Sequence, residues 1–321
     1  MYADEMPAEK DEDVIYEAKM IRAEGTGVTG GDPLLSFERT ERLIRMLKEN
    51  FNEHHIHLYS GTMDHEKVEK LVNAGLDEFR FHPRPEHWGD MGQYKVGLSH
   101  LLDLSMDLGV EIPGLPDKHG AMENLASFLD GMDVLFLNIN ELEFSQENYE
   151  ALLGKGYKPR DDVSAAMDQS REKAMSILEY ANEEGLALSV HYCSSGFKDS
   201  VQLRNRLIRR AETIGRAMDV VTDDGTILKG VVELVDSEPG NVVALLIDEL
   251  GVSKELVEVD WDKKRVEVAP WALEKVAEKI PFPCYIIEEY PTWDRLEVER
   301  TPLEKGVGKK GPVKSSRRKS R

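Results

Sequence analysis

Short apolar segments alternate with longer amphipathic ones through the first two thirds of this 321-residue chain. The short segments predict strands at 27–29, 55–59, 78–82, 110–112, 134–138 and 187–192. The longer segments predict helices at 13–24, 37–51, 64–74, 93–108, 120–129 and 163–184. Strands that alternate with helices at this spacing indicate parallel βαβ units. Because the turn that follows the first predicted strand contains no dinucleotide-type Gly-x-Gly-x-x-Gly, the α/β pattern favours a partial barrel over a doubly wound dinucleotide-binding sheet.

A different order of elements begins near residue 219. Asp223-Asp224-Gly225 is a strong turn signal inside a hairpin predicted for 220–235. After this hairpin the predicted elements are a helix at 241–250, strands at 256–260 and 265–268, a helix at 270–279 and a strand at 285–289. The resulting β-α-β-β-α-β order is typical of a ferredoxin-like domain. We therefore expect the partial barrel to occupy residues 1–218 and a small α+β ferredoxin-like domain to occupy residues 219–303.

The formal net charge of −20 is unevenly distributed along the chain. Residues 304–321 contain eight Lys or Arg against Glu304, a net of +7, which leaves −27 for the other 303 residues. A basic segment that is also rich in Gly, Pro and Ser predicts a disordered tail. The acidic body disfavours binding of nucleic acid by anything other than this tail.

Cysteine content and hydropathy indicate the compartment. Two cysteines in 321 residues argue against a disulfide framework and fit a reducing cytoplasm. No stretch approaches the roughly 20 apolar residues of a membrane span, and the N-terminus lacks the apolar core of a signal peptide. We therefore expect a cytoplasmic protein with no membrane partner.

A short strand and a glycine pair are combined in Gly25-Thr26-Gly27-Val28-Thr29-Gly30-Gly31-Asp32-Pro33-Leu34. Glycine at the end of a strand lets another molecule approach the backbone. This segment resembles the second strand of the radical S-adenosylmethionine (radical SAM) proteins, where a Gly-Gly-Glu-Pro segment holds the amino group of the SAM methionine through backbone groups. The resemblance implies that Gly30, Gly31 and Asp32 bind this cofactor, with Asp32 in place of the usual glutamate.

The resemblance covers most of residues 12–217. The segments His54–Pro83, Val110–Pro116 and His191–Ser195 are similar to an archaeal branch related to the pyruvate formate-lyase activating enzymes. This implies a partial (β/α)6 TIM-like barrel and an enzyme whose [4Fe–4S] cluster cleaves SAM reductively to a 5′-deoxyadenosyl radical, which abstracts hydrogen from a substrate. It also implies an electron donor such as ferredoxin or flavodoxin. The substrate, a small molecule, a peptide or RNA, stays open.

One departure from the family concerns the cluster itself. The defining Cys-x3-Cys-x2-Cys motif is not in this chain, whose only cysteines are Cys193 and Cys284. Two thiols cannot supply the three that hold a site-differentiated [4Fe–4S] cluster. We expect a chain truncated at its N-terminus, without the first strand of the barrel and inactive in reductive cleavage. A true loss of the cluster is the alternative explanation.

Polar residues stand where the later strands are predicted to end, and barrel enzymes gather their functional groups at this edge. Glu111 interrupts an apolar strand, while Asn138 and Asn140 share a face by strand periodicity. The resemblance implies that these three bind the nucleoside of SAM. The candidates for catalytic contact with the substrate are His191, Cys193 and, as a further neighbour, His82.

Two other functions fit parts of the sequence. His55 and His57 lie on one face of a predicted strand, as in barrel metal hydrolases, with His82 and His191 as further candidate ligands. The radical SAM interpretation, in contrast, assigns no metal ligand to any residue of this chain. The basic tail permits a non-catalytic module that associates with RNA, whose binding would be sensitive to salt.

Overall fold

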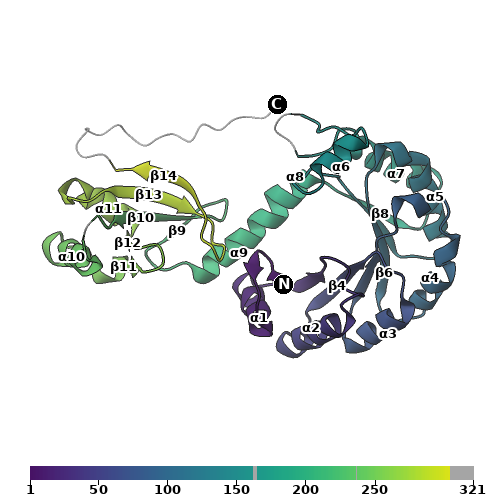
Figure 1. The fold of residues 1–321 in the computed structure, drawn as a ribbon, viewed down its shortest axis with the longest axis horizontal. Coiled ribbons are helices and arrows are strands. Elements are labelled where there is room, and N and C mark those ends of the chain that lie inside the picture. Colours follow the sequence, from purple (N-terminus) through teal and green to yellow (C-terminus); the bar gives the residue numbers. More distant parts are fainter. Residues whose placement is uncertain (162–164, 236, 304–321) are drawn as a thin grey trace. The chain divides into compact units, whose positions relative to one another are not determined.

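A computed structural model describes residues 1–161, 165–235 and 237–303, which form two compact units (Figure 1). Internal contacts assign Met1–Ala3 and Pro7–Arg204 to the first unit, and Asp4–Met6 and the chain from Asn205 to the second. The disordered tail predicted for 304–321 lies outside the described residues. The domain limits at 218 and 303 stay a prediction.

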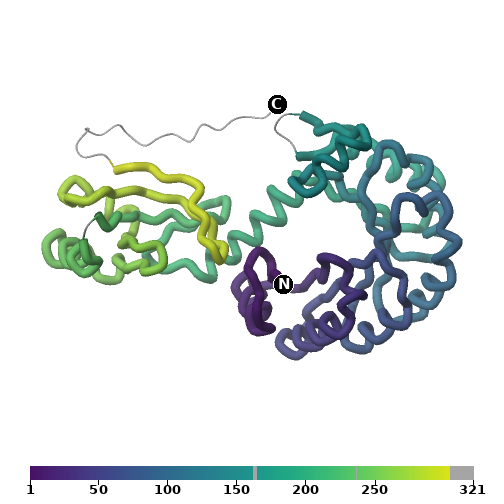
Figure 2. The backbone as a smooth tube through the Cα atoms, viewed as in Figure 1, coloured from purple at the N-terminus to yellow at the C-terminus, as the bar shows by residue number. Residues whose placement is uncertain are grey.

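Six parallel strands form the sheet of the first unit. They are β3 (Gly25–Val28), β4 (His55–Ser60), β5 (Glu78–Phe81), β6 (Asp107–Pro113), β7 (Phe136–Asn140) and β8 (Ser189–Cys193). Their order in the sheet is their order in the chain, so β3 and β8 are its two edges. A sheet whose strands follow one another in a single direction and whose two edges stay apart is consistent with the expected radical SAM partial barrel. Figure 2 shows how the strands curve.

Helices cover the convex side of this sheet (Figure 1). The helices of the first unit are α1 (Asp11–Met20), α2 (Phe37–Asn50), α3 (His65–Ala74), α4 (Lys95–Leu102), α5 (His119–Asp130), α6 (Tyr149–Gly154), α7 (Ser170–Glu183) and α8 (Ser195–Phe197). Alternate strand side chains, among them Leu58, Phe79 and Val110, point to these helices and are fully buried. The remaining side chains of each strand therefore point to the concave side of the sheet, and we call this surface the inner face.

The helices predicted at 93–108 and 163–184 differ most from those of the structure. The helix predicted for 93–108 ends at Leu102, and β6 begins already at Asp107. Leu101, Leu104 and Leu108 fit a helical spacing, but Leu108 belongs to the strand, where it pairs in register with Phe79. The apolar spacing was thus ambiguous between helix and strand. The helix predicted from 163 begins at Ser170.

The second unit contains an antiparallel sheet with the order β11-β12-β10-β13-β14, to which the short β9 adds beside β10. Its strands are β9 (Val220–Val221), β10 (Ile227–Glu233), β11 (Val257–Asp260), β12 (Arg265–Val268), β13 (Cys284–Glu289) and β14 (Glu297–Pro302). Its helices are α9 (Arg204–Ile214), which begins at the last residue of the first unit, α10 (Pro239–Ala244) and α11 (Pro270–Val276). Val232, Val266 and Leu273 form part of the core that α10 and α11 close. The sequence prediction did not include β14.

Charged side chains are buried on the other face of that sheet. Lys229, Arg265, Glu267 and Glu289 are each at most 4% exposed. Arg265 Nη2 donates to Glu289 Oε2 at 2.8 Å and also to Glu267, while Lys229 donates to Glu289. Arg216 pairs with Glu267 as well. Each buried charge in this network therefore has an opposite charge as its partner.

No helix among the described residues is both long enough and apolar enough to cross a membrane. Two further strands, β1 (Tyr2–Ala3) and β2 (Met6–Pro7), form a short ribbon before α1.

Candidate functional site

The inner face presents polar side chains near the carboxyl ends of its strands. Register pairs Glu111 of β6 with Asn138 of β7 and, one strand further, with His191 of β8. Asn140 pairs in the same way with Cys193. Four of the predicted site residues therefore lie in two adjacent rows across β7 and β8, and Glu111 lies beside the first row.

The glycine pair that follows β3 adopts a backbone that other residues rarely take. Gly30 has φ +89° and Gly31 has φ +59°, both in the left-handed region. A Cβ atom added to either glycine would meet nothing within 4 Å. The pair is therefore required by the turn and not by close packing, and the space beside its backbone is open.

Asp32 ties this glycine turn to the end of β4. Its Oδ1 accepts hydrogen bonds from Ser60 Oγ at 2.8 Å and from the backbone N–H of Leu34 at 3.0 Å, and its Oδ2 accepts one from Thr62 Oγ1 at 2.7 Å. Burial alone would raise the pKa of Asp32, but these hydrogen bonds lower it below its ordinary value. Both carboxylate oxygens of Asp32 thus accept hydrogen bonds from the protein, and we call this set of bonds the Asp32 latch.

Glu111 is the centre of a second polar cluster. It is 8% exposed, and its Oε1 accepts from Asn140 Nδ2 at 2.6 Å while its Oε2 accepts from Asn138 Nδ2 at 3.3 Å. Arg80 of β5 donates from Nη1 to the same Oε2 at 3.1 Å. The structure therefore brings together the three residues expected at the nucleoside and adds an arginine.

His82 borders this cluster without joining it. Its Nε2 is 3.7 Å from Glu111 Oε1, and this buried nitrogen has no hydrogen-bond partner among the residues that the structure describes. Burial lowers the pKa of His82, although the charge of Glu111 opposes the shift. His82 is therefore a neutral imidazole beside Glu111 at pH 7.

His191 and Cys193 lie on the edge strand β8, on the same side as the two asparagines. His191 is exposed, and Cys193 is half-buried and not in a disulfide. Burial raises the pKa of the Cys193 thiol, so it is protonated near neutral pH. The thiol can donate a hydrogen atom or a hydrogen bond, but it is not an activated nucleophile.

The two histidines of β4 share the inner face, yet they do not form a metal site. His55 Nε2 lies 3.2 Å from Glu78 Oε2, and the ring centres of His55 and His57 are 5.9 Å apart. In the described ranges no three His, Cys, Asp or Glu side chains are grouped so as to hold a metal ion. The structure therefore does not support the metal-hydrolase alternative.

His57 predicts a measurable pH dependence of stability. Burial lowers its pKa from 6.5 to about 4, and its ring lies over Gly27, where a Cβ would be 2.6 Å from Nε2. Below pH 6.5 the unfolded chain binds a proton that the folded chain binds only near pH 4, so protonation favours unfolding in this window. After allowance for partial exposure, we expect the free energy of unfolding to fall by about 2 kcal/mol between these pH values.

Urea unfolding of the wild type and of His57→Gln at pH 4, 5, 6 and 7 measures this dependence. The difference in the free energy of unfolding between the two proteins should change from pH 7 to pH 4, because only the wild type carries this imidazole. Parallel pH profiles for the two proteins would contradict the assignment.

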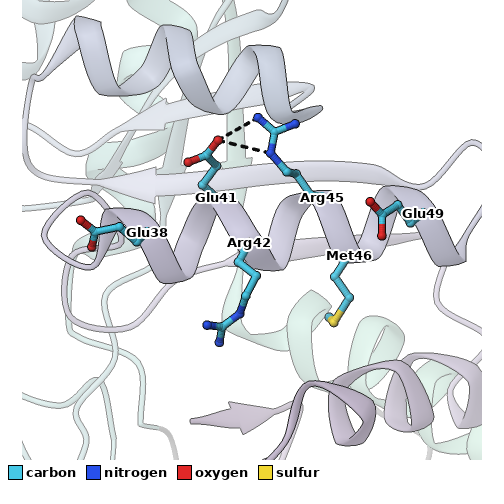
Figure 3. Close-up of a pocket in the computed structure, with 6 residues that line it drawn as sticks. All are labelled: Glu38, Glu41, Arg42, Arg45, Met46 and Glu49. Carbon is cyan, nitrogen blue, oxygen red and sulfur yellow. Dashed lines mark hydrogen bonds and ion pairs between the residues drawn. The ribbon is translucent and has the colours of Figure 1, made fainter.

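A hollow of about 370 Å³ lies on α2, away from the inner face. Figure 3 shows its lining on successive turns of this helix: Glu38, Glu41, Arg42, Arg45, Met46 and Glu49. The Glu41–Arg45 ion pair spans 2.8 Å, and Arg42 pairs with Asp11 of α1. The hollow contains none of the predicted site residues.

Comparisons with known proteins agree with the sequence resemblance. A family model described as a 4Fe-4S single cluster domain matches residues 1–78. A Methanocaldococcus jannaschii protein, named as a candidate glycyl-radical enzyme activating enzyme, is 38% identical over 317 residues, which cover 94% of this chain and 82% of the relative. The chain belongs to the radical SAM family. This is a family of enzymes, and membership implies SAM and an iron–sulfur cluster.

Two further comparisons also match this radical SAM protein. A domain of unknown function (DUF8061) matches residues 225–303. The crystal structure of HydG, a maturase of the [FeFe]-hydrogenase, aligns with a TM-score of 0.40 and 12% identity. That alignment covers 63% of this chain and spans about half (56%) of the length of HydG.

The residues of this radical SAM protein do not fit the cluster that the family implies. The segment matched by the single-cluster model, residues 1–78, contains no cysteine. Cys193 is on β8 of the first unit, and Cys284 is buried on β13 of the second unit. One thiol per unit is fewer than the three that a [4Fe–4S] cluster needs.

Sequence reasoning assigned no role to three residues that shape this site. Arg80 reaches Glu111, and Ser60 and Thr62 hold Asp32. The alternation of charged residues with Phe79 and Phe81 in β5 was the available signal for Arg80. Ser60 and Thr62 are recognisable in the sequence as polar residues at a strand end, but their bonds to Asp32 could not be predicted, because the latch depends on the parallel pairing of β3 with β4.

Proposed function

We propose that this radical SAM protein binds SAM on the inner face, with its methionine end at the glycine turn. The observation that carries this proposal is the open backbone of Gly30 and Gly31, which follows the strand that resembles the SAM-binding segment of the family. Asn138 and Asn140 would contact the nucleoside, with Glu111 behind them. His191, Cys193 and His82 would face the substrate.

The charge of the inner face supports a cationic ligand. On this face Arg80 pairs with the buried carboxylates of Glu78 and Glu111. Burial keeps His57 and His82 neutral near pH 7. Glu78, Glu111 and Arg80 together carry one net negative charge, and the sulfonium of SAM is positive.

We propose that the cluster chemistry of the family is absent from residues 1–321, because the ligands for it are absent. In the family, the cluster supplies the electron that cleaves SAM. By analogy with the name of the Methanocaldococcus jannaschii relative, we propose a protein as the substrate class. A ferredoxin or flavodoxin would serve as electron donor to a form that has cluster ligands, and the cytoplasm is the compartment we propose.

We further propose that residues 219–303 form a ferredoxin-like domain. The order β11-β12-β10-β13 with antiparallel pairing, and two helices against one face, supports this assignment. The edge strand β14 extends this pattern.

Calorimetric titration with SAM tests the proposal. Gly31→Val should weaken SAM binding at least tenfold, because the side chain fills the open space and strains the turn. Gly185→Val is a matched control, since Gly185 also has positive φ (+65°) and open space around its Cβ position but precedes β8 at the opposite end of the sheet. No SAM binding by the wild type, or equal losses in both variants, would overturn the proposed site.

A further inference from the structure

We infer that the Arg80–Glu111 pair acts as a positioning device that fixes the amide orientation of Asn138 and Asn140, so that both present oxygen acceptors to the ribose hydroxyls of the ligand. This inference rests on the proposed SAM site and assigns its hydroxyl specificity. It also changes the role of Glu111, from a ligand contact to a group that orients the residues making the contact.

The orientation of the two amides follows from the chemistry of their partner. An asparagine amide has a donor end, NH₂, and an acceptor end, the oxygen, which are usually hard to distinguish. A carboxylate can only accept hydrogen bonds, so each amide must turn its nitrogen to Glu111. Nδ2 of Asn140 lies 2.6 Å from Oε1, and Nδ2 of Asn138 lies 3.3 Å from Oε2. The two Oδ1 atoms therefore point away from Glu111 and accept from donors.

Arg80 keeps Glu111 available as this acceptor. The side chains of the pair are only 20% and 9% exposed, and a buried carboxylate without a counter-charge is costly. Without Arg80, the Glu111 carboxylate would turn toward water, and the two amides would lose the acceptor that fixes their orientation. Arg80 thus acts on the ligand through Glu111 and then the two asparagines, without contacting the ligand itself.

Arg80 is itself held on several sides. It donates from Nε to Glu78 and from Nη1 to Tyr59 Oη at 2.9 Å. Its guanidinium carbon lies 5.2 Å from the ring centre of Tyr59 and 5.6 Å from that of Phe136. These contacts restrict the Arg80 side chain to one conformation, which it needs in order to position Glu111.

Binding of S-adenosylhomocysteine and its 2′-deoxy and 3′-deoxy analogues tests the inference by calorimetry. The wild type should bind the ribose form about tenfold more tightly than at least one deoxy analogue, the ratio for one lost hydrogen bond. Arg80→Gln should reduce this ratio to below about threefold, and Arg80→Lys should restore part of it. Tyr59→Phe is the matched control, since it removes one contact of Arg80 and leaves the pairs with Glu78 and Glu111, so the ratio should stay. An Arg80→Gln variant that is folded, as judged by its melting temperature, and keeps the wild-type ratio would overturn the inference.

A second measurement does not depend on ligand binding. The side-chain amide protons of Asn138 and Asn140, assigned by their loss in Asn138→Ser and Asn140→Ser, should be well dispersed in proton–nitrogen spectra of the wild type. In Arg80→Gln they should move toward the values of free asparagine. If the wild type binds no S-adenosylhomocysteine, the proposed function fails, and these spectra alone decide the positioning role. Unchanged amide signals in Arg80→Gln would refute it.

Discussion

Anaerobic reconstitution of the 1–321 chain with iron and sulfide is expected to give no [4Fe–4S] cluster, and SAM with dithionite is expected to yield no 5′-deoxyadenosine above background. The reason is the number and placement of thiols. Cys193 lies in the first unit and Cys284 is buried in the second, so one site cannot collect three of them. Iron and sulfide analysis, absorbance near 400 nm and chromatographic detection of 5′-deoxyadenosine measure the outcome.

The Cys193→Ser/Cys284→Ser double variant is the control for this experiment. Because neither thiol is expected to hold iron, the variant and the wild type should bind the same small background amount. Four iron atoms per wild-type chain, lost in the double variant, would show that the cysteines of the 1–321 chain assemble a cluster and would contradict the prediction.

Replacing Glu267 with alanine is expected to destabilise the second unit by about 3–5 kcal/mol. Glu267 is fully buried and accepts from Arg265 and Arg216, with Lys229 Nζ 3.6 Å away. Its removal leaves cations in a region with little access to water, and this costs more than the lost pairing itself. Urea unfolding followed by tryptophan fluorescence suits the measurement, since three of the four tryptophans are in this unit: Trp261, Trp271 and Trp293.

Glu258→Ala is the matched control. Glu258 also pairs with Arg216, at 2.9 Å, but its side chain is 55% exposed. An exposed pair contributes at most about 1 kcal/mol, so this variant should unfold close to the wild type. If both variants lost the same free energy of unfolding, burial of the carboxylate would not determine the cost of removing it from this network.

The main features of the first unit could be predicted from sequence because its strands carry strong apolar patterns. Each of the six predicted strands overlaps a strand of the parallel sheet, and the misplaced end of the helix at 93–108 reflects a leucine spacing that suits both helix and strand. β14 was missed for the opposite reason. Its residues Glu297–Pro302 are mostly exposed at a sheet edge, so they show no apolar alternation.

The site was harder to predict than the fold, because its interactions cross strands. Glu111, Asn138 and Asn140 were recognisable as polar residues at strand ends, but their hydrogen bonds depend on the register of β6 with β7. Arg80 lies 31 residues from Glu111 in the chain, and their contact requires the neighbouring pair β5 and β6 to be in place. A single sequence gives the alternation within a strand but not the partner of each side chain.

The Asp32 latch makes the identity of residue 32 depend on residues 60 and 62. A glutamate at this position would carry its carboxylate about 1.5 Å further, past the hydroxyls that Ser60 and Thr62 offer to aspartate. Substitutions at the three positions should therefore be coupled, since groups that share hydrogen bonds do not act additively. Grafting the glycine turn from another family member would require the end of β4 to be exchanged with it. A successful graft would therefore include both the turn after β3 and the end of β4. The four-residue motif at the glycine turn would not be enough.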